Sequence, residues 1–212
     1  MILVTGIGTD VGKTLVSAIL TEALQADYWK PVQAGFAGGT DAETVRALIS
    51  NPVSVVHDEL YRLHTPASPH IAARKDGLRI AIPTIVQQAE ILEPLAGSRP
   101  FIVEGAGGLL VPLNETEKVA DLAKALKARL ILVSRNYLGS INHSLLTADY
   151  CRSHELDVAG WIFSDDYMAY EDEIVGWSGY PSLGSIPALH SVTRSTVKEQ
   201  SDLLRDGLAK LL

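Results

Sequence analysis

The sequence predicts an α/β fold built on a single doubly wound, mostly parallel sheet, and two observations lead to that prediction. Short apolar runs alternate with longer amphipathic segments along the whole chain. Most of the runs lack polar alternation, which is typical of strands covered by helices on both faces. No linker, repeat or low-complexity tract divides the chain, so we expect one domain over residues 1–212.

Each predicted element follows from its pattern and its length. Strand-length apolar runs occupy residues 2–6, 28–32, 101–104, 130–134, 158–163 and 183–186. Helical periodicity extends over residues 13–26, 42–50, 82–95, 119–128, 141–154, 167–177 and 197–212. This alternation predicts βαβ units with right-handed crossovers. Because ligands of such sheets bind beyond the carboxyl ends of the strands, the residues directly after each run are the candidate functional residues.

Composition limits the classes of function. The chain has 212 residues, 47% of them hydrophobic and 20% charged, which is enough for a continuous buried core. Its net charge of -7 argues against a nucleic-acid partner, whose phosphates need a basic surface. The single cysteine, Cys151, cannot form an internal disulfide and indicates a reducing compartment. No stretch approaches the roughly 18 apolar residues of a membrane span, so we expect a cytoplasmic protein without a membrane partner.

A glycine-rich segment, GIGTDVGKT at residues 6–14, joins the first predicted strand to the first predicted helix. Glycines allow the backbone to curl with its N–H groups inward, and the helix N-terminus adds positive potential. Lys13 would reach the phosphates of a nucleoside triphosphate, and the Thr14 hydroxyl suits Mg²⁺. The segment makes the chain P-loop NTPase-like, with five residues between Gly6 and Gly12. The alternative is a glycine-rich turn that contains Gly-Lys-Thr by chance.

Three charged residues follow later in the pattern. Lys30 lies near the end of the second run, either as a second ammonium group beside the loop or as a solvated lysine. Asp41 opens a predicted helix, either as an ordinary first-turn residue or as a Mg²⁺ ligand. Glu104 ends the third run, where a buried acid is costly unless it is paired or metal-bound. A purely structural role is the alternative for Glu104.

Three further segments occupy similar positions. The helix start at residues 139–143 exposes amides that could capture a carboxylate, or it carries an ordinary Ser140 N-cap. The last two predicted strands end in Ser164-Asp165 and in Ser185-Ile186-Pro187, which are positions suited to contacting a nucleotide base.

Taken together, these segments resemble the dethiobiotin synthetase family of biotin biosynthesis. A P-loop is shared by many proteins, but the extra loop residue combined with Lys-Pro, Glu-Gly-Ala-Gly-Gly and Ile-Asn-His segments in this order is much more specific. The matching pieces run in order across nearly the whole chain: residues 6–14, 30–32, 40–41, 68–70, 103–108, 112–113, 139–143, 146–147, 160–161 and 184–187.

The resemblance implies an ATP-dependent cyclo-ligase, with Mg²⁺ as cofactor and ATP as co-substrate. The family's substrate, 7,8-diaminopelargonate, carries two adjacent amines and a terminal carboxylate. CO₂ forms a carbamate on one amine, and the carbamate attacks the γ-phosphoryl group of ATP to give a carbamic–phosphoric anhydride. The second amine then closes a cyclic urea and expels phosphate. Because closure is intramolecular, its entropic cost is largely met before the bond forms.

The resemblance also implies a role for each matched residue. The catalytic residues would be Lys30, Lys13 and Thr9, and the Mg²⁺ ligands would be Thr14, Asp41 and Glu104. The nucleotide would be bound by Asp10, Val11, Gly12, Lys13, Thr14, Leu15, Asp41, Glu104, Gly105, Ala106, Gly107, Ser164, Asp165, Ser185, Ile186 and Pro187. The diamine would be bound by Lys30, Ala34 and Ser68 and, from the partner subunit of a homodimer, by Leu138, Gly139, Ser140, Ile141 and Asn142.

This chain departs from the family pattern at three of these positions. Asp10 stands where Glu is frequent. Ala34 stands where Ser or Thr is common, so Gln33 or a backbone amide would have to replace a hydroxyl contact to the substrate. Ser164 stands where Asn is usual, and a single rotating hydroxyl is less selective for adenine than an amide. We therefore expect weak discrimination between ATP and other triphosphates.

Three other classes of protein fit parts of the sequence. A partition-type ATPase switch shares the fold, but it places a second lysine early in the loop, where this chain has Gly8. A non-catalytic nucleotide-binding regulatory domain would not need both Lys30 and Glu104. An amidating enzyme of tetrapyrrole acids carries a nucleophilic cysteine near a strand end, whereas Cys151 lies in a helical pattern.

Overall fold

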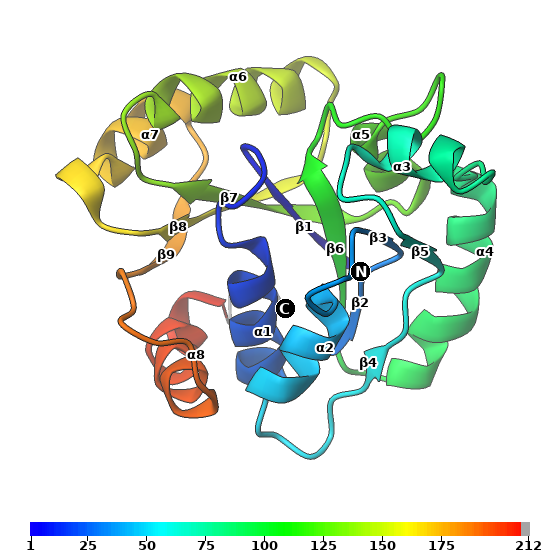
Figure 1. The fold of residues 1–212 in the computed structure, drawn as a ribbon. Coiled ribbons are helices and arrows are strands. Elements are labelled where there is room, and N and C mark those ends of the chain that lie inside the picture. Colours follow the sequence, from blue (N-terminus) through cyan, green and yellow to red (C-terminus); the bar gives the residue numbers. More distant parts are fainter. Residues whose placement is uncertain (209–212) are drawn as a thin grey trace.

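The computed structural model describes residues 1–208, which form a parallel sheet covered by helices on both faces (Figure 1). The seven strands lie in the order β4-β2-β6-β1-β7-β8-β9, and each neighbouring pair is parallel. The predicted α/β fold with a mostly parallel sheet is confirmed. The strands of this sheet are β1 (Ile2–Gly6), β2 (Asp27–Trp29), β4 (Val56–His57), β6 (Phe101–Gly108), β7 (Arg129–Arg135), β8 (Val158–Ser164) and β9 (Ser182–Ile186).

The helices form two layers, each with its own apolar cluster against the sheet. Helices α1, α2 and α8 cover one face, and α3 to α7 cover the other (Figure 1). The helices are α1 (Lys13–Leu24), α2 (Asp41–Leu48), α3 (Pro69–Lys75), α4 (Ile82–Leu92), α5 (Val119–Ala125), α6 (Ser140–Ser153), α7 (Glu171–Ser178) and α8 (Arg194–Leu208). Within residues 1–208, no helix is long and apolar enough to cross a membrane.

Strand β1 shows why the apolar runs lack polar alternation. Leu3 packs into the cluster under α3 to α7, whereas its neighbours Ile2 and Val4 pack into the cluster under α1, α2 and α8. Successive side chains of a strand point to opposite faces, so a strand buried on both faces must be apolar throughout. With β6 on one side and β7 on the other, β1 holds its following loop at the centre of the carboxyl edge.

The predicted end of the second strand, residues 28–32, is wrong. β2 stops at Trp29, and the chain leaves the main sheet to form β3 (Val32–Ala34), which pairs with β5 (Tyr61–Leu63) in a separate two-stranded parallel sheet. Pro31 explains the break, since it has no N–H to donate to a central ladder. Its carbonyl instead accepts from the N–H groups of Leu60 and Tyr61, at 3.1 and 2.9 Å.

Two predicted helices also differ from the structure. Residues 167–177 do not form one helix, because Met168 and Ala169 have positive φ angles of 55° and 48° in a short 3₁₀ turn, Tyr167–Ala169, before α7. The segment 82–95 ends as an α-helix at Leu92 and continues as a 3₁₀ turn, Glu93–Ala96. The last four residues of the predicted helix 197–212 lie outside the described part of the chain.

Candidate functional site

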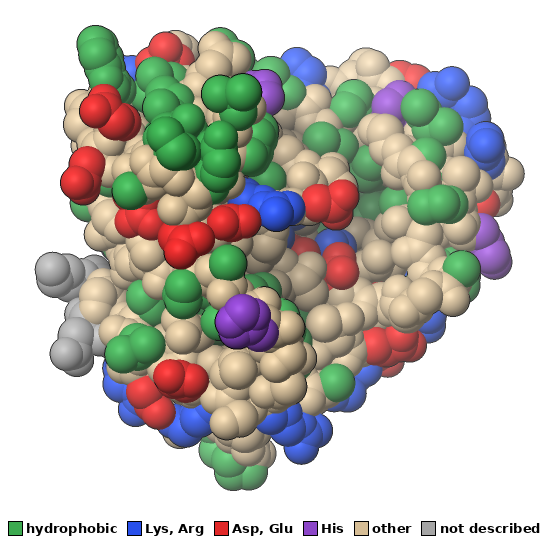
Figure 2. Space-filling model, turned by 60° about the vertical axis from the view of Figure 1, so that its left-hand side comes forward, with side chains coloured by type: hydrophobic (Ala, Val, Ile, Leu, Met, Phe, Trp, Pro, Cys, Tyr) green, Lys and Arg blue, Asp and Glu red, His purple; other side chains and the backbone are tan. Residues whose placement is uncertain are grey.

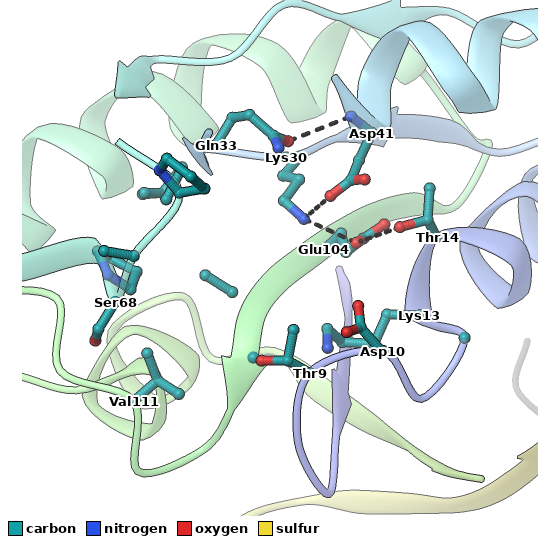
Figure 3. Close-up of a pocket in the computed structure, with 18 of the residues that line it drawn as sticks. Thr9, Asp10, Lys13, Thr14, Lys30, Gln33, Asp41, Ser68, Glu104 and Val111 are labelled. Atoms are coloured by element: carbon teal, nitrogen blue, oxygen red, sulfur yellow. Dashed lines mark hydrogen bonds and ion pairs between the residues drawn. The ribbon is translucent and has the colours of Figure 1, made fainter. Parts of the chain in front are cut away.

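A cavity of about 810 Å³ opens at the carboxyl edge of the sheet, between the β3–β5 pair and the glycine-rich loop of residues 6–14, called the phosphate loop below (Figure 3). Acidic and basic side chains stand together around a hollow in the face shown in Figure 2. Gln33, Pro66, Ala67, Pro69, Val32 and Val111 complete the lining. The predicted site residues that line the cavity are Thr9, Asp10, Gly12, Lys13, Thr14, Leu15, Lys30, Ala34, Asp41, Ser68, Glu104, Ala106 and Gly107.

The phosphate loop has a backbone that requires glycine at its end. Gly12 has φ 94° and is the N-cap of α1. A Cβ on Gly12 would lie 2.9 Å from Ser164 Oγ at the end of β8, so both its angle and its neighbour exclude a side chain. In the structure Lys13 Nζ donates to Gly8 O at 2.7 Å, which holds the ammonium group against its own loop. This backbone conformation is the one expected of a phosphate cradle.

Glycines at the end of β6 allow that strand to touch the phosphate loop. A Cβ on Gly108 would lie 2.9 Å from Gly6 O, so a larger residue would push the strand away from the loop. Val4 pairs with Glu104 in the β1–β6 ladder, which places the Glu104 carboxylate directly beside the loop.

Glu104 is the centre of a buried hydrogen-bonded cluster. Its Oε1 accepts from Thr14 Oγ1 at 3.1 Å and from Lys30 Nζ at 3.0 Å (Figure 3). Lys30 also donates to Asp41 Oδ2, so one ammonium group bridges two carboxylates. Lys30 is 6% exposed and Glu104 1% exposed, which rules out the solvated lysine considered above. The structure therefore brings together groups from α1, α2, β6 and the residue directly after β2, which are far apart in the sequence.

Burial and charge act on the two lysines in different ways. Burial lowers the pKa of Lys13 to about 8, against the opposing effect of the Glu104 charge. Burial also acts to lower the pKa of Lys30, but the charges of Glu104 and Asp41 and their hydrogen bonds raise it above its ordinary value. Lys30 is consequently a permanent cation, whereas the Lys13 ammonium is stabilised less well until an anion reaches it.

Asp41 is not the cap of its helix. Thr40 is the N-cap of α2, and it forms a capping box with Glu43, through bonds of 3.1 and 2.8 Å. The Asp41 side chain therefore does not cap the helix and accepts a hydrogen bond from Lys30 instead. The Asp41 backbone N–H donates to Gln33 Oε1 at 3.2 Å (Figure 3). Because Gln33 Nε2 in turn donates to Gly35 O, at 2.9 Å, the Gln33 amide ties the Asp41 backbone to the end of β3.

Of the predicted base-contacting residues, Ser164 lies against Gly12 of the loop, and none of them lines the cavity. Asp165 Oδ2 lies 3.3 Å from the Arg135 guanidinium, and its backbone N–H donates to Ile186 O at 3.0 Å. Ser185 donates to Glu171, at the start of α7. Asn136, which is not among the predicted site residues, is buried and donates to Asp165 O at 3.1 Å. Its position directly after β7 was the available signal.

The helix start at residues 138–142 does not reach the cavity within one chain. Gly139, with φ 103°, is the N-cap of α6, and Ser140 is the first helical residue, so the alternative of an ordinary Ser140 N-cap is wrong. The Ser140 hydroxyl accepts from the N–H of Tyr137 at 3.3 Å. A second, mainly apolar cavity of about 400 Å³ lies between α6 and the loop after β6. Two of its lining residues, Leu110 and Leu146, have exposed side chains.

The residues around Glu104 fit a magnesium ion. Within residues 1–208, no three His, Cys, Asp or Glu side chains gather into a metal-binding group. Mg²⁺ is commonly held by one or two carboxylates together with substrate phosphates, and this site offers Glu104, Asp41 and the Thr14 hydroxyl. The Lys30 ammonium already occupies the space between both carboxylates, which shows that this position favours a cation.

Cys151 lies buried in α6 as a free cysteine. Burial raises the pKa of its thiol to about 12, so it stays protonated and is a poor nucleophile. The amidating-enzyme class, which needs a reactive cysteine, receives no support from this residue.

Comparisons with known proteins agree over nearly the whole chain. A family model described as an AAA domain matches residues 1–196. The chain is 46% identical to an ATP-dependent dethiobiotin synthetase of Cytophaga hutchinsonii over 205 residues, which covers 96% of each chain. It is 42% identical to the enzyme of that name from Christiangramia forsetii, over 98% of this chain and 97% of the relative.

Solved structures with the same fold are more distant in sequence. The MinD cell division protein of Aquifex aeolicus superposes with a TM-score of 0.62 at 14% identity, covering 99% of this chain and 95% of that one. A ParA family ATPase of Chlorobium tepidum gives a TM-score of 0.58 at 14% identity, covering 99% and 90%. At this identity the likeness shows the fold alone, which is that of P-loop NTPases.

Proposed function

Since the chain belongs to the ATP-dependent dethiobiotin synthetase family, we propose that it carboxylates and cyclises 7,8-diaminopelargonate to dethiobiotin with ATP, Mg²⁺ and CO₂. The observation that carries the proposal is the bridge that Lys30 makes between Asp41 and Glu104, beside the phosphate loop. A regulatory nucleotide-binding domain would not need a buried catalytic cation between these two carboxylates. The partition-type switch is disfavoured by Gly8, which stands where its second lysine would be.

The phosphate end of ATP would be bound by the loop that precedes α1. Backbone N–H groups from Asp10 to Leu15 surround the phosphates, and the Lys13 ammonium turns from Gly8 O to the β- and γ-phosphates. Thr14, Asp41 and Glu104 would hold Mg²⁺. When bound, Mg²⁺ neutralises phosphate charge and orients the γ-phosphoryl group.

The reacting centre lies where Lys30 enters the cavity. CO₂ first forms a carbamate on one amine, and the carbamate oxygen then attacks the γ-phosphorus of ATP, so that the bond to ADP breaks. Lys30 and Lys13 stabilise the negative charge that spreads over the phosphoryl oxygens. The second amine attacks the carbamoyl carbon, closes the ring and expels phosphate. Thr9 lines the same cavity and would contact the reacting groups.

The diamine would occupy the part of the cavity between Ala34 and Ser68. Gln33 cannot easily replace the hydroxyl that Ala34 lacks, because both ends of its amide already bind backbone groups. The backbone of the β3 end and the Ser68 hydroxyl are the remaining polar partners on this wall. Ser68 Oγ lies 3.0 Å from His70 Nδ1, which orients it.

A homodimer would complete the substrate site with the start of α6. The backbone N–H groups that follow Leu138 and Gly139 lie at the N-terminus of α6. The positive potential there favours a carboxylate such as the substrate tail. Leu138 is 82% exposed and Leu146 is 61% exposed, so this side of α6 offers apolar surface to a second copy. A partner subunit would thereby bring residues 138–142 to a cavity they do not reach in their own chain.

The dimer has a direct test. Leu146→Glu should convert a dimer to a monomer in analytical ultracentrifugation and should raise the KM for the diamine. Leu203→Glu is the matched control, because Leu203 is 68% exposed on α8, on the opposite layer of helices. A wild-type monomer with full activity would exclude this arrangement.

The activity itself is tested by incubating the protein with ATP, Mg²⁺, bicarbonate and the diamine. Mass spectrometry should detect the cyclic urea, with one phosphate released for each ring formed. Omission of the diamine should abolish phosphate release. ATP hydrolysis that proceeds equally without the diamine and yields no urea would instead favour an ATPase switch. The cytoplasm, where a free thiol such as Cys151 stays reduced, is the proposed location.

A further inference from the structure

Tyr28 lies in the core, yet its hydroxyl group reaches the charged cluster. The side chain is fully buried and packs with Ile102 and Val4 in the cluster beneath α1. Its hydroxyl donates to Glu104 Oε2 at 2.9 Å. The strand register explains the contact: Tyr28 pairs with Ile102, and Glu104 lies two residues further along β6 on the same face.

The two oxygens of the Glu104 carboxylate have different surroundings. Oε1 accepts from Thr14 and Lys30, and both of these residues line the cavity. Oε2 accepts from Tyr28, whose ring belongs to the apolar core. One oxygen of the same carboxylate therefore faces the nucleotide site, and the other faces the interior.

A glutamate held through one oxygen has a poorly defined orientation, since the terminal torsion of its side chain has a broad minimum. The Tyr28 hydroxyl provides a second point of attachment on the opposite oxygen. Without that hydroxyl, Oε2 would be a buried acceptor without a partner, which is costly. The carboxylate would then rotate to share its existing donors, and the direction of Oε1 would change.

We propose that Tyr28 is a positioning residue, whose hydroxyl directs Glu104 Oε1 towards Thr14 and the Mg²⁺ of the bound nucleotide. The inference rests on the proposed function only in assigning Mg²⁺ to Glu104. Tyr28 acts through Glu104 and contacts neither ATP nor the diamine. Partners that orient a metal ligand typically contribute about 10- to 100-fold in metal affinity.

The test is the removal of one oxygen atom by Tyr28→Phe, which keeps the ring in the core. Tyr61→Phe is the matched control, because the Tyr61 hydroxyl also makes one bond, accepting from the N–H of Ala81 at 3.2 Å, outside the cavity lining. Mg²⁺ is titrated calorimetrically into each protein in the presence of a non-hydrolysable ATP analogue. Circular dichroism and thermal unfolding verify that both variants are folded.

Tyr28→Phe should weaken Mg²⁺ binding by about tenfold or more, whereas Tyr61→Phe should leave it unchanged. Turnover of Tyr28→Phe should recover at saturating Mg²⁺, which a general loss of structure would not allow. Mg²⁺ affinity within twofold of wild type would overturn the proposal. So would an equal loss in both variants.

A double-mutant cycle with Glu104→Asp gives an independent readout. Shortening the side chain by one methylene withdraws the carboxylate from the Tyr28 hydroxyl, so Tyr28→Phe should then weaken Mg²⁺ binding much less than it does alone. Full additivity of the two substitutions would show that Tyr28 does not act through Glu104. Because the titration requires no diamine, a failure of this proposal is distinguishable from a failure to form dethiobiotin.

Discussion

The two halves of the sheet's carboxyl edge satisfy their polar groups differently. On the β2–β6–β1 side, Lys30, Glu104 and Lys13 are all buried, and each is bonded within the site. On the β8–β9 side, Asp165 is only half-buried and Ser185 is exposed, and both bond to side chains at the surface. The first side is a closed network of charges, and the second is open to water.

This difference indicates how each side responds to substitution. A buried charge is costly unless it is paired, so removing one partner on the β2–β6–β1 side leaves another charge uncompensated. On the open side, water replaces a lost partner at little cost. We therefore expect the effects of mutation to decrease from the phosphate end of the nucleotide to its base.

The largest effect is expected for Lys30→Ala. This substitution removes a preorganised cation from the proposed reacting centre, so kcat should fall by about a hundredfold or more. In the free protein the Lys30 ammonium lies between Asp41 and Glu104. Its removal leaves both carboxylates available to Mg²⁺, so binding of ATP with Mg²⁺ should persist. Steady-state kinetics and calorimetric nucleotide binding measure the two quantities separately.

Lys124→Ala is the control for this substitution, since Lys124 is an exposed lysine of α5. It should leave kcat and nucleotide binding unchanged. If Lys30→Ala retained near-full turnover, the catalytic role proposed for Lys30 would be wrong, and the contrast between the two halves would lose its main support.

The next largest effect is a change of about tenfold in ATP affinity with pH, which depends on the protonation of Lys13. Its pKa of about 8 in the free protein should rise when a triphosphate supplies negative charge, so binding takes up a proton above pH 8. ATP affinity should be constant below that pH and about tenfold weaker near pH 9. Calorimetry across this range measures it, with Lys13→Arg as the variant whose binding should not follow pH, since its guanidinium stays protonated. A flat profile in the wild type would contradict the prediction.

Lys13 should also make folding stability depend on pH, but in the opposite direction to ATP affinity: stability should rise with pH. The unfolded lysine keeps its proton up to its ordinary pKa of 10.5, whereas the folded one releases it near 8. Between these values the unfolded state binds more protons, so the contribution of Lys13 to stability rises with pH. Below pH 8 the cost of burying the ammonium is fully present. Denaturant unfolding of wild type and of Lys13→Met across this window measures the contribution.

The sequence predicted those site residues whose position follows from a strand end. Glu104 closes an apolar run, and parallel strands bring their carboxyl ends to the same edge, so its meeting with the phosphate loop could be expected. Pro31 even marked the end of β2, although the predicted strand continued past it. Such signals are local, because they depend on the chain within a few residues.

The remaining contacts depend on pairings between distant segments. Asp41 reaches Lys30 only because Thr40 and Glu43 cap α2 and because Gln33 binds its backbone. Tyr28 looks like an ordinary core tyrosine in the sequence, and its hydroxyl meets Glu104 only through the β2–β6 register. No local pattern contains that register, so these roles required the three-dimensional structure.

A smaller effect is expected at the base. Ser164 lies against Gly12 and carries one hydroxyl where an amide would offer both a donor and an acceptor. The wild type should therefore turn over ATP and CTP at comparable rates. Ser164→Asn should favour ATP by about 2- to 10-fold, the effect of one net hydrogen bond. Competition between the two triphosphates measures the ratio, and a strong ATP preference in the wild type would refute the role given to Ser164.

The smallest effect is expected for Arg135→Ala, on the open side. Arg135 and Asp165 form an ion pair at 3.3 Å, with side chains 50% and 26% exposed. Exposed pairs of this kind contribute about 0–1 kcal/mol, so the KM for ATP should change by less than about fivefold. The Asp165 backbone should stay in place, because its N–H and carbonyl are held by Ile186 and Asn136. A loss comparable with that of Lys30→Ala would mean that the base side, too, depends on a paired charge, and that exposure alone does not separate the two halves.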